Sequence, residues 1–158
     1  MLWFKRRHPN ARPTHRLAQA SLFASLSERE LDTLQSFMHA RQFLPGEVIF
    51  DEGEDGQALY IVLSGHVLIC RHGGIKQPIA QLGIGEFFGE LGLLDDWPRS
   101  AQAVAGQSTE LAVLFRGDFE RLMESHAQIA SRIAMQLARY LGQRLRGMVG
   151  KTAVEAGE

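Results

Sequence analysis

The chain has 158 residues, of which 45% are hydrophobic and 22% are charged, and its formal net charge is −1. This is the length of one ordinary domain, with a composition typical of a globular protein that buries its own core. The longest apolar run, Ala58–Leu63, is too short to cross a membrane. A single cysteine, Cys70, excludes an internal disulfide and favours a reducing compartment, so we expect the protein in the cytoplasm.

Residues 1–20 are expected to form a basic arm that is partly disordered. All of its charged residues are basic: Lys5, Arg6, Arg7, Arg12 and Arg16. Such an arm can contact nucleic acid or an anionic membrane surface, and the apolar residues 2–4 add a candidate membrane anchor. A solvated terminus is favoured over either contact.

A short helix and a turn are predicted next. Ser27 and Glu30 have the spacing of a capping box, and apolar residues at 31, 34, 37 and 38 recur at helical spacing. We therefore expect an amphipathic helix that ends near Ala40. The sequence Leu44-Pro45-Gly46-Glu47 then fits a type II turn, with proline second and glycine third.

From the turn to Phe115 the chain alternates short β-branched or aromatic runs with glycine turns. Many short strands with regular turns favour an antiparallel barrel or roll over a parallel sheet. The candidate strands are Val48–Phe50, Ala58–Leu63, His66–Arg71, Lys76–Leu82, Ala101–Ala105 and Glu110–Phe115.

The stretch 88–101, Phe-Gly-Glu-Leu-Gly-Leu-Leu-Asp-Asp-Trp-Pro-Arg-Ser-Ala, carries the strongest functional signal. Gly89 lets a ligand approach the backbone, and Arg99 supplies a guanidinium that can bind a phosphate through two parallel hydrogen bonds. The carboxylate of Glu90 would repel a phosphate beside it unless it also accepts a hydrogen bond from a hydroxyl of the same ligand. Glu90 therefore indicates that the ligand carries a sugar hydroxyl. The pair therefore indicates a ribose phosphate.

The chain ends in predicted helix. Gly117-Asp118 offers a cap for a helix that ends near His126, and a longer helix is expected over 128–148, followed by a disordered tail at 151–158. The long helix carries an apolar stripe at 129, 133, 137, 141, 145 and 148. Two uses of the stripe stay open, a dimer interface through Ile133–Leu145 or burial against the chain's own barrel. Gly142 interrupts the helix and can mark a bend or a close helix contact.

The stretch 88–101 closely resembles the phosphate-binding cassette of cyclic nucleotide-binding domains, which occur in the bacterial catabolite activator protein and in the regulatory subunits of cyclic-AMP-dependent kinase. The family pattern Phe-Gly-Glu-(Leu/Ile)-(Gly/Ala)-Leu, a short loop and Pro-Arg-(Ser/Thr/Ala)-Ala is filled at every position. The resemblance covers about 22–148. It implies a mainly β fold, an eight-stranded antiparallel β-roll (a jelly-roll-like barrel) with an N-terminal helix and two C-terminal helices, as one domain over 21–150.

The resemblance also implies which residues bind the ligand. Glu90 would accept from the ribose 2′-OH and Arg99 would pair with the cyclic phosphate, assisted by Ser100 and the backbone N–H groups of Gly89, Leu91 and Ala101. Matching outward from the cassette, it implies an apolar wall for the base and a lid from the long helix; these residues are Ile69, Ile79, Ala80, Leu82, Tyr140, Arg144 and Leu145.

Catalysis and metal binding are not indicated. Glu90 with Arg99 is neither a nucleophile–base pair nor a general acid–base pair, and Ser100 has no histidine neighbour in sequence. His66 and His72 lack the further ligands that a metal needs, so surface histidines are the favoured interpretation.

The sequence therefore predicts a non-enzymatic cyclic nucleotide sensor with cAMP preferred over cGMP, no cofactor, and a homodimer formed through the long helix. Too few residues follow Met148 for a helix-turn-helix. We accordingly expect no sequence-specific DNA binding and a signal passed through a partner protein. The alternative is a ligand-free dimerisation or adaptor module on the same fold.

Overall fold

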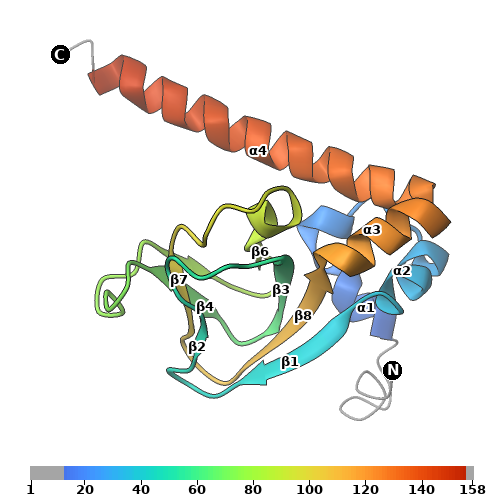
Figure 1. The fold of residues 1–158 in the computed structure, drawn as a ribbon, viewed down its shortest axis with the longest axis horizontal. Coiled ribbons are helices and arrows are strands. Elements are labelled where there is room, and N and C mark those ends of the chain that lie inside the picture. Colours follow the sequence, from blue (N-terminus) through green and yellow to red (C-terminus); the bar gives the residue numbers. More distant parts are fainter. Residues whose placement is uncertain (1–12, 156–158) are drawn as a thin grey trace.

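A computed structural model describes residues 13–155 of the chain. Eight strands form two antiparallel four-stranded sheets, which pack as a β-roll and do not close into a barrel, with helices at both ends of the sequence (Figure 1). The fold class predicted from the sequence is confirmed. Within the described residues, no helix is both long and apolar enough to span a bilayer.

The first sheet has the strand order β1-β8-β3-β6 and the second has the order β2-β7-β4-β5. The bounds of the strands are β1 His39–Phe43, β2 Val48–Phe50, β3 Ala58–Ser64, β4 Val67–Cys70, β5 Ala80–Leu82, β6 Phe87–Phe88, β7 Gln102–Ala105 and β8 Thr109–Phe115.

The helices precede β1, follow β8, and in one case form a turn inside the roll. They are α1 Pro13–Ala18, the 3₁₀ turn η1 Ser21–Phe23, α2 Glu28–Gln35, the 3₁₀ turn η2 Glu90–Leu93, α3 Arg116–Ser125 and α4 Ala127–Glu155. Helix α4 crosses over the roll and extends beyond it (Figure 1).

The core has two parts because the central strands β3 and β8 are buried on both faces. In β3, Leu59 and Ile61 pack against the helices, whereas Val62 packs inside the roll between the sheets. This is the alternation expected of a pleated strand, whose successive side chains point to opposite faces. The helix-side core extends to Ile129, Ile133 and Leu137 of α4.

Two arginine–glutamate ion pairs connect the terminal helices to other parts of the domain. Arg16 donates to both carboxylate oxygens of the buried Glu110 on β8, at 3.0 and 2.8 Å. Arg132 of α4 donates to both oxygens of Glu30, at 2.6 and 2.7 Å. The sequence suggested that Arg16 belongs to a solvated arm, but this residue is paired with Glu110 instead. The other four basic residues of that arm lie outside the described residues.

Two local sequence signals, the capping box and the type II turn, are confirmed, whereas the cap expected at Gly117-Asp118 is not formed, because α3 begins at Arg116 and has Phe115 as its N-cap. The capping box is formed, with Glu30 N–H donating to Ser27 Oγ and Ser27 N–H donating to the Glu30 carboxylate. The type II turn is formed as well. Glu47 N–H donates to the Leu44 carbonyl at 3.1 Å, and Gly46 has a φ of 82°.

The predicted element boundaries need four corrections. The helix predicted after Ser27, α2, ends at Gln35 and not near Ala40, because residues 39–43 pair with β8 instead. The run 76–82 is strand only from Ala80, since Pro78 has no N–H to donate and a glycine turn precedes it. Strands β1 and β6 were not predicted. Helix α4 continues to Glu155, so residues 151–155 of the expected tail are helical.

Candidate ligand-binding pocket

The stretch 88–101 forms one side of a pocket of about 900 Å³, and the strands β4 and β5 form the other. Helix α4 contributes Tyr140 and Arg144 at its mouth. All but one of the site residues expected from the sequence line this pocket; Leu145 does not, and its side chain is exposed.

Gly89 sets the backbone of the cassette. Its φ of 72° lies in the left-handed region, which favours glycine, and its carbonyl accepts from Gly92 N–H at 3.0 Å to begin η2. A Cβ at this position would stand 2.8 Å from Arg99 Nη1 and 3.1 Å from the Ala58 carbonyl. The close approach of backbone and arginine therefore requires glycine here.

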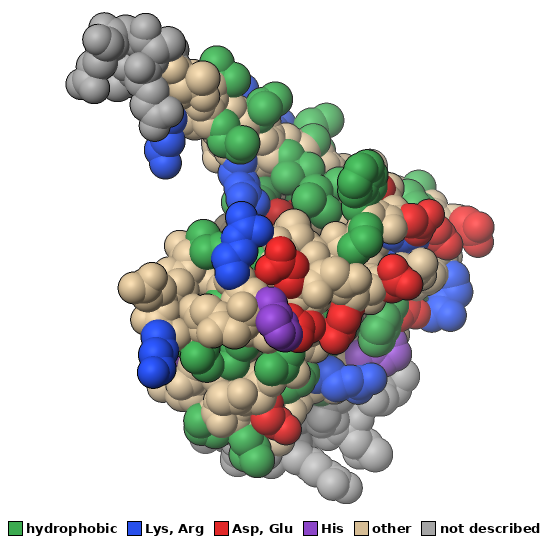
Figure 2. All heavy atoms as spheres, turned by 60° about the vertical axis from the view of Figure 1, so that its left-hand side comes forward, with side chains coloured by type: hydrophobic (Ala, Val, Ile, Leu, Met, Phe, Trp, Pro, Cys, Tyr) green, Lys and Arg blue, Asp and Glu red, His purple; other side chains and the backbone are tan. Residues whose placement is uncertain are grey.

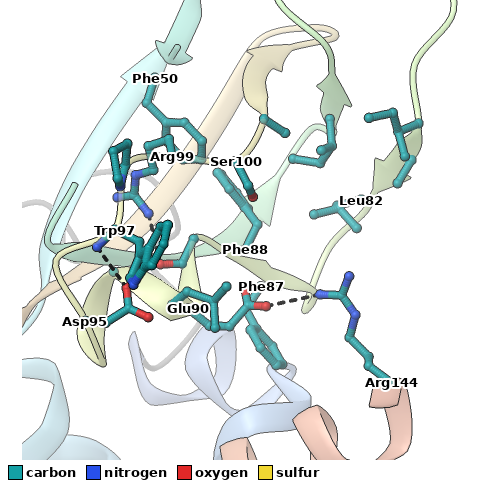
Figure 3. Close-up of a pocket in the computed structure, with 18 of the residues that line it drawn as sticks. Phe50, Leu82, Phe87, Phe88, Glu90, Asp95, Trp97, Arg99, Ser100 and Arg144 are labelled. Carbon is teal, nitrogen blue, oxygen red and sulfur yellow. Dashed lines mark hydrogen bonds and ion pairs between the residues drawn. The ribbon is translucent and has the colours of Figure 1, made fainter. Parts of the chain in front are cut away.

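Arg99 is buried and held by backbone carbonyls. Its Nη1 donates to the Gly89 carbonyl and its Nη2 to the Ala58 carbonyl, each at 3.0 Å, while the Phe50 ring lies 4.3 Å from its Cζ (Figure 3). Burial lowers the pKa of Arg99, because desolvation penalises the charged form. Among the described side chains, its Nε is a buried nitrogen without a hydrogen-bond partner.

Glu90 is also buried, at the start of η2, and its Oε1 accepts from Arg144 Nη1 at 3.2 Å (Figure 3). Arg144 itself is more than half exposed, so the pair joins the buried floor of the pocket to the surface of α4. The pocket thus holds the carboxylate of Glu90 as an acceptor and the guanidinium of Arg99 as a cationic donor, nine positions apart in the chain.

Apolar side chains line the rest of the pocket. Ile69 on β4 pairs with Ala80 on β5, and Leu82 follows on the same strand. Several lining residues were not predicted from the sequence: Phe50, Arg71, Phe87, Phe88 and Trp97. Trp97 lies inside the cassette and Phe88 at its edge, so both could have been found from their position alone, whereas Phe50 on β2 and Arg71, which follows β4, are distant from the cassette in sequence.

The two histidines considered for a metal have other roles. His72 Nδ1 lies 2.8 and 2.9 Å from the two carboxylate oxygens of Asp51, and the ring of His66 packs against Gly106. Within residues 13–155, no cluster of three or more histidine, cysteine or acidic side chains has the arrangement that a metal ion needs.

A β-roll with a glycine-led turn, a buried arginine and a buried glutamate in one pocket defines a class of ligand-binding domain. The sequence matches the family of cyclic nucleotide-binding domains over residues 40–126, which is more than half of the chain. The chain therefore belongs to the cyclic nucleotide-binding domain family.

Individual relatives agree with this assignment. The cyclic AMP receptor protein of Thermus thermophilus is 44% identical over 122 residues, which are 76% of this chain and 56% of that protein. A cAMP-dependent protein kinase regulatory subunit of Aspergillus niger is 35% identical over 107 residues, 68% of this chain and 26% of that one. The chain thus spans about half, or less, of the length of these relatives.

Solved structures share the fold. The catabolite activator protein of Thermus thermophilus superposes with a TM-score of 0.76 at 39% identity, over 87% of this chain and 63% of that one. A cyclic nucleotide-binding domain from Methylobacillus flagellatus gives a TM-score of 0.74 at 28% identity, over 87% and 79% of the two chains.

Proposed function

We propose that this protein is a non-enzymatic sensor that binds a cyclic nucleotide, with cAMP preferred over cGMP. The observation that carries the proposal is the burial of Glu90 and Arg99 among the residues that line one pocket of about 900 Å³. A phosphate oxygen is a strong acceptor for a guanidinium, and a ribose hydroxyl can donate to a carboxylate.

In this binding mode the cyclic phosphate lies at Arg99 and Ser100, and Glu90 accepts from the ribose 2′-OH. The base rests against the apolar wall at Ile69 and Leu82, with Tyr140 at the mouth of the pocket. The preference for cAMP is supported by relatives named for cAMP, at 44% and 35% identity.

The signal would leave through helix α4. Its first half is buried against the rest of the chain, including Ile133 and Leu137, so these residues are not available to a dimer interface. The second half exposes Leu145, Met148 and Val149 where α4 extends from the roll, and green side chains lie along this part (Figure 2). We place the homodimer and partner-protein contacts there. This exposed segment also favours the alternative function, a dimerisation module that needs no nucleotide.

Mass spectrometry of the purified and denatured protein separates the two functions. A sensor expressed in cells that make cyclic nucleotides should release cAMP, and added cAMP should raise the melting temperature more than cGMP or 5′-AMP does. Release of no nucleotide, together with an unchanged melting temperature in all three ligands, would favour the dimerisation module.

A further inference from the structure

Arg116 lies outside the pocket but directs its whole side chain at the cassette. It is the first residue of α3, and it is largely buried. Its Nε and Nη2 donate to the Gly92 carbonyl at 3.1 and 2.8 Å, and Nη2 also donates to the Asp95 carbonyl. Its Nη1 pairs with Asp96 Oδ1 at 2.6 Å. Every one of these acceptors belongs to the stretch 88–101.

The position of this arginine is unfavourable for helix α3 itself. The N-terminal end of a helix carries partial positive charge, so a cation in the first turn is disfavoured there. The charge of Arg116 therefore does not stabilise the N-terminal end of α3, whose N-cap is Phe115. Its backbone N–H also donates to the Gln57 carbonyl at 2.8 Å, next to Ala58, whose carbonyl binds Arg99.

Two arginines thus hold η2 from opposite ends. Arg99 binds the Gly89 carbonyl before the turn, and Arg116 binds the Gly92 and Asp95 carbonyls at and after its end. Glu90, the buried carboxylate of the pocket, lies between these two attachments. A guanidinium has the fixed fork of donors that such a set of carbonyls requires.

We propose that Arg116 is a positioning residue of the binding site, which holds η2 in the conformation that presents Glu90 and the cassette backbone to the nucleotide. This inference rests on the proposed function. A turn that is held in its binding conformation loses less conformational freedom when the ligand binds, so the arginine should raise affinity without touching the ligand.

The test compares Arg116→Ala, Arg116→Lys and the control Arg121→Ala with the wild type. Arg121 lies on the same helix but pairs with Asp118 and is largely exposed. Calorimetry with cAMP should show affinity about tenfold lower or more for Arg116→Ala, intermediate for Arg116→Lys, and within about twofold of wild type for Arg121→Ala.

Hydrogen exchange supplies a readout that does not need the nucleotide. In the wild type the amides of Gly92, Leu94 and Asp95 donate within the cassette. Arg116→Ala should accelerate their exchange while β3 and α3 exchange as in the wild type. Equal cAMP affinity and equal cassette exchange in Arg116→Ala and wild type would overturn the inference, as would acceleration spread evenly over the domain. A wild type that does not bind cAMP would refute the proposed function, while exchange still tests the positioning role.

Discussion

Arg99 is packed between the ring of Phe50 and the backbone of Gly56. The ring lies 4.3 Å from the guanidinium carbon, and a Cβ on Gly56 would stand 1.9 Å from Arg99 Nε. No side chain fits at position 56 unless the arginine leaves its two carbonyl acceptors. Gly56 precedes the cassette by more than thirty residues, and its role could not be predicted from the motif, because it depends on how β3 passes behind Arg99.

Gly56→Ala is expected to weaken cyclic nucleotide binding by about tenfold or more, because the methyl group displaces Arg99 from its place. Overpacking should also lower the free energy of unfolding by about 1–3 kcal/mol. Titration with cAMP and thermal unfolding measure the two effects.

Gly117→Ala is the matched control. A Cβ there has no neighbour within 4 Å among the described residues, so affinity should be unchanged. Stability should change by no more than about 1 kcal/mol, in the favourable direction, since alanine is the better helix former. Equal losses of affinity in the two variants would contradict the packing account.

At the scale of elements, local chemistry decides what could be predicted. The capping box at Ser27 and the turn at Gly46 depend on neighbours within three residues, and both were predicted. Strand β1 shows no alternation of buried and exposed residues, and it forms by pairing with β8 about seventy positions later. Strand β6 has two residues, too few for any periodicity. Long-range pairing fixes such elements, and a single sequence does not display it.

The same distinction holds in the site. The cassette residues are contiguous, so their pattern could be recognised. The contact of Arg144 with Glu90 joins residues 54 positions apart, and it depends on the path of α4 over the roll. Arg144 was expected to lie near the base, and the structure places it on the buried carboxylate.

The ion pair of His72 with Asp51 predicts how the stability of the fold depends on pH. His72, after β4, contacts Asp51, after β2. Hydrogen bonding and the charge of Asp51 raise the pKa of His72 above its usual 6.5, so its stabilising contribution is complete below pH 6.5 and is lost as the pH rises through the raised value. The contact with His72 lowers the pKa of Asp51 below 3.8, so the contribution of Asp51 is lost only in stronger acid.

The melting temperature of wild type should therefore exceed that of His72→Gln by more at pH 6 than at pH 8.5. His126→Gln is the control, because His126 contacts the hydroxyl of Ser125 and not a carboxylate. Thermal unfolding across this range gives the comparison. A difference between wild type and His72→Gln that stays constant with pH would refute the paired state.

At the scale of the whole molecule, helix α4 divides into a buried half and an exposed half. If the exposed half forms the proposed homodimer, Leu145→Glu should shift the protein from dimer to monomer, because a charge is costly to bury in an apolar interface. Light scattering coupled to size-exclusion chromatography measures the mass.

Met123→Glu is the control for the dimer, since Met123 is an exposed apolar residue on α3. It should leave the mass of the particle unchanged. A wild-type protein that is monomeric at micromolar concentration would rule out the dimer through this surface. So would a Leu145→Glu variant whose mass equals that of the wild type.

Calorimetric titration with cAMP of the wild type, Arg99→Ala and Glu90→Ala shows whether the pocket binds a cyclic nucleotide through these two residues. We expect saturable binding at micromolar or tighter affinity. Arg99→Ala should lose about 2–4 kcal/mol of binding free energy, because a partly buried phosphate loses its charged partner. Glu90→Ala should lose less binding free energy. It removes a hydrogen bond to the ribose, but it also removes a negative charge that repels the phosphate. No binding heat with cAMP or cGMP up to millimolar concentration would contradict the assignment of this pocket to a cyclic nucleotide.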